Sequence, residues 1–302
     1  MTGESGEQLL THRKQLSAQL LREVMVLTHP RLRLHPNIVS LFWYDLVEES
    51  DGLYTPALIL ERATLGSLSD LLDVRQSRLS YECKRCLCLD ICSGLLALHQ
   101  AFVVHGDVKS DNVLIFPSST SPGRYAAKIT DFGSIISTAT PINGEYPRYH
   151  GTPLTNAPEV GEQSGLGKLD AMGLIRCDNY SLGLLIFQTA TGTLHQEVTT
   201  KNAGVLESAL CQLQQAGHPD EIEKVLMQVL EHLLTYEPSR RCCDLSIIKN
   251  LLRPVQSNDL SVAEYGSNLT NLHRCSWLIK CTVFSSYPAM TCYGKKETYL
   301  TL

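Results

Sequence analysis

The sequence has 302 residues, of which 43% are hydrophobic, and a formal net charge of -5. This length suffices for one large domain or two lobes around a substantial core. The mild negative charge gives no sign of a surface that binds a polyanion, so we expect no nucleic acid partner. The first residues lack the features of a secretory signal, and no apolar run approaches the roughly 20 residues that span a bilayer. We therefore expect an intracellular, cytoplasmic protein with no membrane partner.

The chain contains 11 cysteines, and several of them lie close together. Cys83, Cys86, Cys88 and Cys92 leave a zinc site open as one alternative. Residues 80–99 have helical periodicity, however, so these thiols point in several directions, and cysteine often packs as a small hydrophobic residue. An odd number of cysteines without a secretion signal also argues against a disulfide framework. The more favoured interpretation is therefore a set of packed thiols.

The first part of the chain is predicted to form a helix and two strands. Residues 7–27 carry leucine and valine at three- and four-residue steps, which is typical of an amphipathic helix. Residues 40–46 and 56–61 are apolar enough for two strands that a polar loop connects. A helix beginning near Ser67 and the long helix at 80–99 follow.

The residues suited to chemistry begin in the stretch VVHGDVKSDNVLIF, at 103–116. Asp107 can accept a proton from an attacking hydroxyl, Lys109 can steady a phosphate, and Asn112 can help to hold a metal ion. This arrangement suits phosphoryl transfer.

Two further motifs follow in the order of the protein-kinase signature set. The tripeptide Asp-Phe-Gly stands at 131–133, directly after a predicted strand at 126–130, and Ala-Pro-Glu stands at 157–159. Each tripeptide alone is a weak signal, but all three motifs in this order are improbable by chance. From about Leu21 to Leu252, the chain resembles a eukaryotic-type protein kinase.

The resemblance implies an α+β, two-lobed protein-kinase-like fold. Residues 1–60 would be a partial small lobe with the αC helix and strands 4 and 5 of the family. Residues 61–66 would be the hinge, and residues 67–253 a mainly helical large lobe. Residues 254–302 are a tail to which we assign no structure or function.

The resemblance is incomplete in the small lobe. Glu23 would be the acidic partner of the strand-three lysine of the family, but no lysine on a strand precedes it. Gly3 and Gly6 lack the spacing of a glycine-rich phosphate loop. We therefore expect a truncated small lobe. Either the chain is incomplete or the protein does not need those strands, and the sequence leaves both explanations open.

The resemblance also implies an ATP- and Mg2+-dependent kinase that transfers the γ-phosphate to a serine or threonine of a protein substrate. Asp107 would be the catalytic base, Lys109 the phosphate-side cation, and Asn112 and Asp131 the ligands of Mg2+. Lysine two residues after the aspartate is typical of serine/threonine kinases. The alternative is a catalytically weak or inactive kinase-like binding module, because the strand-three lysine and the glycine-rich loop are absent. No oligomeric state is predicted.

The residues expected to bind the nucleotide are Glu23, Leu60, Glu61, Ala63, Asp70 and Leu114. The hinge backbone would hydrogen-bond the adenine, Leu60 would guard the back of the site, Leu114 would lie beneath the ring, and Asp70 would lie near the ribose. A strand followed by a capped helix explains Gly66 and Ser67 equally well, so the hinge pattern alone is weak.

The residues expected to support the site are His105, Phe132, Gly133, Thr152, Glu159, Asp178 and Arg241. By the resemblance, His105 and Phe132 pack internally, and Thr152 lies near the catalytic loop. Glu159 forms a buried pair with Arg241, and Asp178 anchors the catalytic-loop backbone from a buried central helix.

One departure from the family pattern concerns regulation. Gly106 stands where most of the family has an arginine, which in regulated kinases pairs with a phosphorylated activation loop. We therefore predict that any activity is independent of phosphorylation of this loop.

Overall fold

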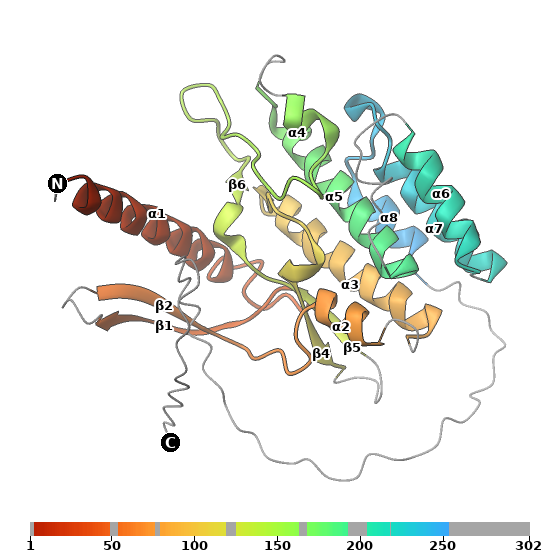
Figure 1. The fold of residues 1–302 in the computed structure, drawn as a ribbon, viewed down its shortest axis with the longest axis horizontal. Helices are drawn as coiled ribbons and strands as arrows, with labels where there is room; N and C mark the ends of the chain where they lie inside the picture. Colours follow the sequence, from red (N-terminus) through yellow and green to blue (C-terminus); the bar gives the residue numbers. More distant parts are fainter. Residues whose placement is uncertain are drawn as a thin grey trace, which may run out of the picture.

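A long helix and a two-stranded hairpin form the smaller of two parts of this computed structural model (Figure 1). The helix is α1 (Gly3–Leu27), and the hairpin joins β1 (Leu41–Glu48) to β2 (Tyr54–Leu60). The described residues are 3–48, 54–75, 79–118, 125–162, 168–192, 204–217 and 219–253. The predicted tail at 254–302 lies outside them.

Apolar residues at the carboxyl end of α1 attach the small part to the rest of the molecule. Val26 and Leu27 are buried there, and so are Ile38 and Val39 in the following loop. The amide of Val39 donates to the carbonyl oxygen of Ile129 at 3.0 Å. The burial of these side chains, about 1.5–3 kcal/mol for each large one, holds the end of α1 against the larger part.

The hairpin, in contrast, exposes most of its apolar side chains. Its antiparallel register runs from Leu41 opposite Leu60 to Glu48 opposite Tyr54. Among the described residues, no other strand pairs with either of its edges. The large apolar side chains exposed on the hairpin are Phe42, Trp43, Tyr44, Leu46, Val47 and Tyr54.

The larger part is built around two long helices that pack against each other (Figure 1). The first is α3 (Tyr81–Gln100), which begins where the Ser80 hydroxyl accepts a hydrogen bond from the amide of Cys83. The second is α5 (Ala171–Thr191), capped by the carboxylate of Asp170. It begins before the apolar run at Asp178 and is buried around most of its circumference. None of the described helices is both long and apolar enough to cross a membrane.

Shorter elements complete the larger part. Three short elements precede α5 in the chain: α2 (Leu68–Arg75), η2 (Ser110–Asn112) and α4 (Pro158–Glu162). After α5 come α6 (Val205–Gln215), α7 (Asp220–Leu233), η5 (Pro238–Arg240) and α8 (Leu245–Leu251). The apolar face of α7 turns Leu226, Val229, Leu230 and Leu233 into the core.

Two small antiparallel sheets position the loops of interest. In one sheet, β3 (Val103–Val104) pairs with β6 (Ile136–Ser137). In the other, β4 (Val113–Pro117) pairs with β5 (Tyr125–Ile129). A single helical turn, η3 (Phe132–Ser134), follows β5. The loop after β3 and the turn after β5 therefore lie at the same end of the β4–β5 hairpin, and the turn contacts α1.

Candidate active site

The carboxylate of Asp107 is held by three side chains in the loop after β3. Thr152 Oγ1 donates to its Oδ1 at 2.7 Å, and Lys109 Nζ lies 2.8 Å from its Oδ2. Asn112 Nδ2 donates to Oδ2 at 3.2 Å and to the backbone oxygen of Asp107 at 2.9 Å. Lys109 also donates to Thr152 Oγ1 at 2.8 Å. The structure thus brings together the predicted residues of the loop and Thr152, which was also predicted and lies 45 residues away in the sequence.

This arrangement keeps Asp107 ionised. Burial by itself would raise the pKa of its carboxyl, but hydrogen bonds from Lys109 and Thr152 and the charge of Lys109 outweigh burial. The pKa of Asp107 is therefore below its ordinary value. An ionised carboxylate that remains partly accessible can accept a proton from a hydroxyl.

Asn112 and Asp131 meet at the end of the β4–β5 hairpin. The amide of Thr130 donates to the carbonyl oxygen of Asn112 at 3.0 Å, which brings Asp131 next to Asn112. Asp131 has a φ of 62°, a left-handed conformation that aspartate adopts more readily than most residues, and its carboxylate accepts from the amide of Gly133. The nitrogen of the Asn112 amide donates to Asp107, so Oδ1 is the atom of this side chain that could bind a metal ion. Two hard oxygens of this kind suit Mg2+.

The turn after Asp131 links the hairpin to α1. Phe132 is fully buried, and its ring centroid lies 5.7 Å from that of His105, which is also fully buried. His105 Nε2 lies 3.1 Å from the carbonyl oxygen of Thr130. Arg22 of α1 donates through Nε to the carbonyl oxygen of Gly133 at 2.8 Å. Packing and one hydrogen bond therefore fix the turn that carries Asp131.

Asp178, on α5, holds the backbone before Asp107. Its Oδ2 accepts from the amide of His105 at 2.7 Å, and its Oδ1 accepts from the amide of Gly106 at 3.0 Å. His99 Nε2 lies 3.0 Å from Oδ2, and Tyr149 donates to Oδ1 at 2.9 Å. Burial would raise the pKa of Asp178, but the hydrogen bond and charge of His99, the charge of His105 and the amide of Gly106 lower it below the ordinary value. Sequence reasoning predicted the backbone contact and missed His99 and Tyr149.

These features agree with a comparison of the sequence with known families. Residues 8–253, which are more than half of the chain, match the family model described as the protein kinase domain. The chain belongs to the protein kinase family. Its fold is the α+β fold of that family, with the larger lobe mainly helical.

Several curated kinases are similar over part of this chain. Serine/threonine-protein kinase shk2 of Schizosaccharomyces pombe is 34% identical over 56% of this chain and 25% of the relative. Serine/threonine-protein kinase PkaB of Streptomyces coelicolor is 33% identical over 65% of this chain and 45% of the relative. A probable serine/threonine-protein kinase of Dictyostelium discoideum is 25% identical over 80% of this chain and 15% of the relative. This chain therefore spans less than half the length of these relatives.

Glu23, on the αC-like helix α1, lies in an electrostatically unusual place for a kinase glutamate. Burial, together with the nearby charge of Asp131, raises the pKa of Glu23 to about 7. Among the described residues, no lysine or arginine forms an ion pair with it. The structure therefore brings Glu23 close to Asp131 but shows no cationic partner for it.

The connection between the lobes is tied to the β4–β5 hairpin. The carboxylate of Glu61 accepts from Lys128 Nζ at 2.6 and 2.8 Å and from the amide of Ser40 at 2.7 Å. Leu114 lies beside this connection, because Ser67 forms a β-bridge with it. Its side chain is partly buried, as is that of Leu60 at the end of β2. The ion pair with Lys128 was not predicted, because a lysine on a strand ordinarily faces solvent.

Asp70 and Ala63 have local structural roles in the same connection. The carboxylate of Asp70 accepts from the amide and hydroxyl of Ser67, both at 2.8 Å, and the amide of Asp70 donates to the Ser67 hydroxyl at 3.1 Å. This is a reciprocal cap at the start of α2. The carbonyl of Ala63 accepts from the amide of Gly66 at 3.4 Å. The capped-helix interpretation of Ser67 therefore describes this segment, and a role of Asp70 or Ala63 toward a nucleotide remains a proposal.

Glu159, in α4, and Arg241, directly after η5, form an ion pair. Arg241 Nη1 lies 2.6 Å from Glu159 Oε1, and the guanidinium is buried. Arg241 also donates to the backbone oxygens of Thr235 and Arg176 and lies over the ring of Tyr180. Because each nitrogen of the guanidinium donates to at least one oxygen, its burial is compensated.

Two of the four thiols of α3 belong to the core. Cys88 and Cys92 are 1% and 0% exposed, and burial raises the pKa of each to about 12, so both remain protonated. Within the described part of the chain, no three His, Cys, Asp or Glu residues are grouped to hold a metal ion. For these two cysteines, the packed-thiol interpretation is confirmed.

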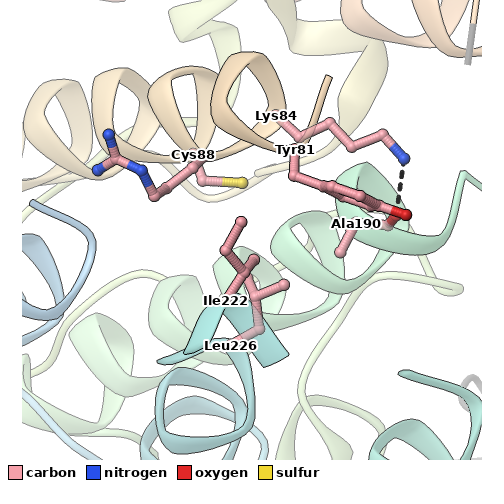
Figure 2. A pocket seen from close by; sticks show the side chains of 7 residues that line it. Tyr81, Lys84, Cys88, Ala190, Ile222 and Leu226 are labelled. Carbon is pink, nitrogen blue, oxygen red and sulfur yellow. Dashed lines mark hydrogen bonds between the residues drawn. The ribbon is translucent and has the colours of Figure 1, made fainter. Parts of the chain in front are cut away.

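A small hollow lies between α3, α5 and α7, away from Asp107 (Figure 2). Lys84 Nζ donates there to the carbonyl oxygen of Ala190 at 2.8 Å, near the carboxyl end of α5. A cation at that end stabilises a helix. The hollow has a cavity volume of about 10 Å³, far below that of ligand pockets, so we assign it a packing role. Its lining residues are Tyr81, Lys84, Arg85, Cys88, Ala190, Ile222 and Leu226.

Proposed function

We propose that this chain is an ATP-dependent protein kinase domain that phosphorylates serine or threonine. The observation that carries the proposal is the cluster of Asp107, Lys109, Asn112 and Thr152 around one carboxylate, next to Asp131. Phosphoryl transfer depends mainly on positioning and on electrostatic stabilisation, and this cluster supplies both. The curated relatives named above are serine/threonine kinases, which supports the same specificity.

In this proposal, Asp107 accepts the proton of the substrate hydroxyl. Its lowered pKa keeps it ionised at neutral pH, and the hydrogen bond from Thr152 orients one of its oxygens. Lys109, held between Asp107 and Thr152, provides positive charge for the transferred phosphate. Lysine at this position is the residue-level argument for serine or threonine rather than tyrosine.

Asn112 Oδ1 and the carboxylate of Asp131 would hold Mg2+. The metal, when bound, neutralises charge on the phosphates of ATP. The chain contributes by fixing both oxygens through the β4–β5 hairpin and through the buried ring of Phe132.

The connection between the lobes is proposed to hold the nucleotide. The backbone of Glu61 and Ala63 would hydrogen-bond the adenine, and the side chains of Leu60 and Leu114 would contact its ring. Asp70 would lie near the ribose. The ion pair between Glu61 and Lys128 supports this role, because it fixes the connection through the side chain of Glu61 and does not involve its backbone.

The direct test is Mg2+-ATP phosphotransfer to a generic serine/threonine substrate. We expect Asp107→Asn and Asp131→Asn each to reduce the rate by about 10²- to 10⁴-fold, as expected for the loss of a base or a metal ligand. Asp73→Asn, on the exposed face of α2, is the matched control and should retain the full rate. Equal rates in all four proteins would contradict the proposal. Absence of both transfer and nucleotide binding would leave a kinase-like binding module.

A further inference from the structure

Tyr149 is a buried residue in a mostly exposed part of the activation segment, which we define as residues 131–159. Its side chain is 2% exposed, whereas its neighbours Arg148 and His150 are both exposed. The activation segment therefore lies against the protein interior at Tyr149, although the flanking side chains are in solvent. Burial, and then the charge of Asp178, raises the pKa of Tyr149 well above its ordinary value, so the phenol stays protonated and donates.

The hydrogen bond of Tyr149 ends on an atom that also holds the catalytic loop. Asp178 Oδ1 accepts from the Tyr149 hydroxyl at 2.9 Å and from the amide of Gly106 at 3.0 Å. Asp178 is fully buried and cannot exchange these donors for water. One carboxylate oxygen therefore joins the activation segment to the residue that precedes Asp107.

The backbone after Tyr149 packs directly on the same loop. Gly151 has a φ of 49°, and a β-carbon there would lie 3.0 Å from the carbonyl oxygen of Gly106. One residue later, Thr152 donates to Asp107 Oδ1. Three residues span at most about 11 Å, so a fixed Tyr149 limits where the Thr152 hydroxyl can be.

We propose that Tyr149 is a positioning residue that anchors the activation segment to the catalytic loop through Asp178, without phosphorylation. The inference rests on the proposed kinase function. A phosphate on the loop orders a kinase by pairing with an arginine, and Gly106 offers no such cation here. The neutral phenol of Tyr149 instead hydrogen-bonds the carboxylate of Asp178, an anion that requires no phosphorylation. A phosphate on Tyr149 would instead remove the donor and add negative charge beside Asp178.

The test compares Tyr149→Phe with Tyr146→Phe in the full 302-residue chain. Tyr149→Phe removes only the hydroxyl that bonds a charged group, and we expect kcat/KM for a peptide substrate to fall about tenfold, with KM for ATP unchanged. Tyr146 is the matched control, because it is in the same segment and donates only weakly, at 3.4 Å, to the carbonyl oxygen of Thr138. Its variant should stay within about twofold of the wild type. A variant that was merely less folded would lose kcat without a selective rise in the KM for the peptide.

Amide hydrogen exchange provides a readout that does not require activity. In Tyr149→Phe we expect faster exchange in residues 150–157 and unchanged exchange in α7, which is remote from the link. If exchange and the KM for the peptide both match the wild type, the anchor is wrong. If exchange rises but no variant and no wild-type protein transfers phosphate, the anchor stands and the proposed function fails.

Discussion

Gly106 and Ser134 approach so closely that a β-carbon on Gly106 would lie 2.3 Å from the carbonyl oxygen of Ser134. Gly106 also has a φ of 81°, which residues with a side chain rarely adopt. In this kinase, glycine before Asp107 therefore fits both the conformation and the space. An arginine could not be placed there without moving the start of the activation segment.

We predict that Gly106→Ala destabilises the protein more than its conformation alone explains. Gly144 is the matched control, because it has a φ of 80° and a β-carbon there would meet nothing within 4 Å. Gly144→Ala should cost only the left-handed conformation, about 1–2 kcal/mol. Gly106→Ala should cost about 1–3 kcal/mol more, as overpacking does. Urea unfolding measures both variants, and equal losses would show that the contact with Ser134 relaxes freely.

The second prediction concerns the exposed hydroxyl groups early in the activation segment. Ser134, Ser137 and Thr140 are exposed and precede Tyr149. Because the segment is held by packing and by the bond to Asp178, replacing all three with alanine should leave phosphotransfer within about twofold of the wild type, as surface changes usually do. Phosphatase-treated wild-type protein is the control and should be equally active. A triple variant that folds normally, by circular dichroism, yet has no activity would refute independence from phosphorylation.

The parts of the site that could be predicted from residue types and spacing alone are local in sequence. The distant contacts of Glu159 with Arg241 and of Asp178 with the catalytic loop were expected only from the family resemblance. Asp107, Lys109 and Asn112 lie within one short loop, so their types and spacing carry the inference without knowledge of the fold. Asp131 follows a predicted strand directly. For these residues, the sequence motif indicates both their chemical role and their position in the fold.

The parts that were missed depend on contacts between distant segments. Tyr149 reaches Asp178 from 29 residues away, and His99 reaches it from 79 residues away. Tyr149 lies in a segment without a periodic pattern, and the helical periodicity of residues 80–99 does not identify a partner for His99. The ion pair of Glu61 and Lys128 likewise joins residues 67 positions apart. Only the packing of the large lobe determines these pairs, and a single sequence does not encode them as a local signal.

The last prediction uses the raised pKa of Glu23. Its carboxyl has an ordinary pKa of 4.5 in the unfolded chain and a pKa of about 7 in the folded one, because burial and the charge of Asp131 disfavour ionisation. The folded state therefore binds this proton more tightly than the unfolded state. The stabilising contribution is complete below the unfolded value and is lost as the pH rises through about 7. The full difference is about 3 kcal/mol, since one pKa unit corresponds to about 1.4 kcal/mol.

Urea unfolding of the wild type and of Glu23→Gln at about pH 5 and about pH 8 measures this contribution. Glutamine cannot ionise, so the variant should lose less stability between the two pH values and should exceed the wild type at the higher one. Glu231→Gln, at an exposed position on α7, is the control and should follow the wild type. If Glu23→Gln loses as much stability with pH as the wild type, then Glu23 is not the group that titrates, and its charge is compensated in the folded protein.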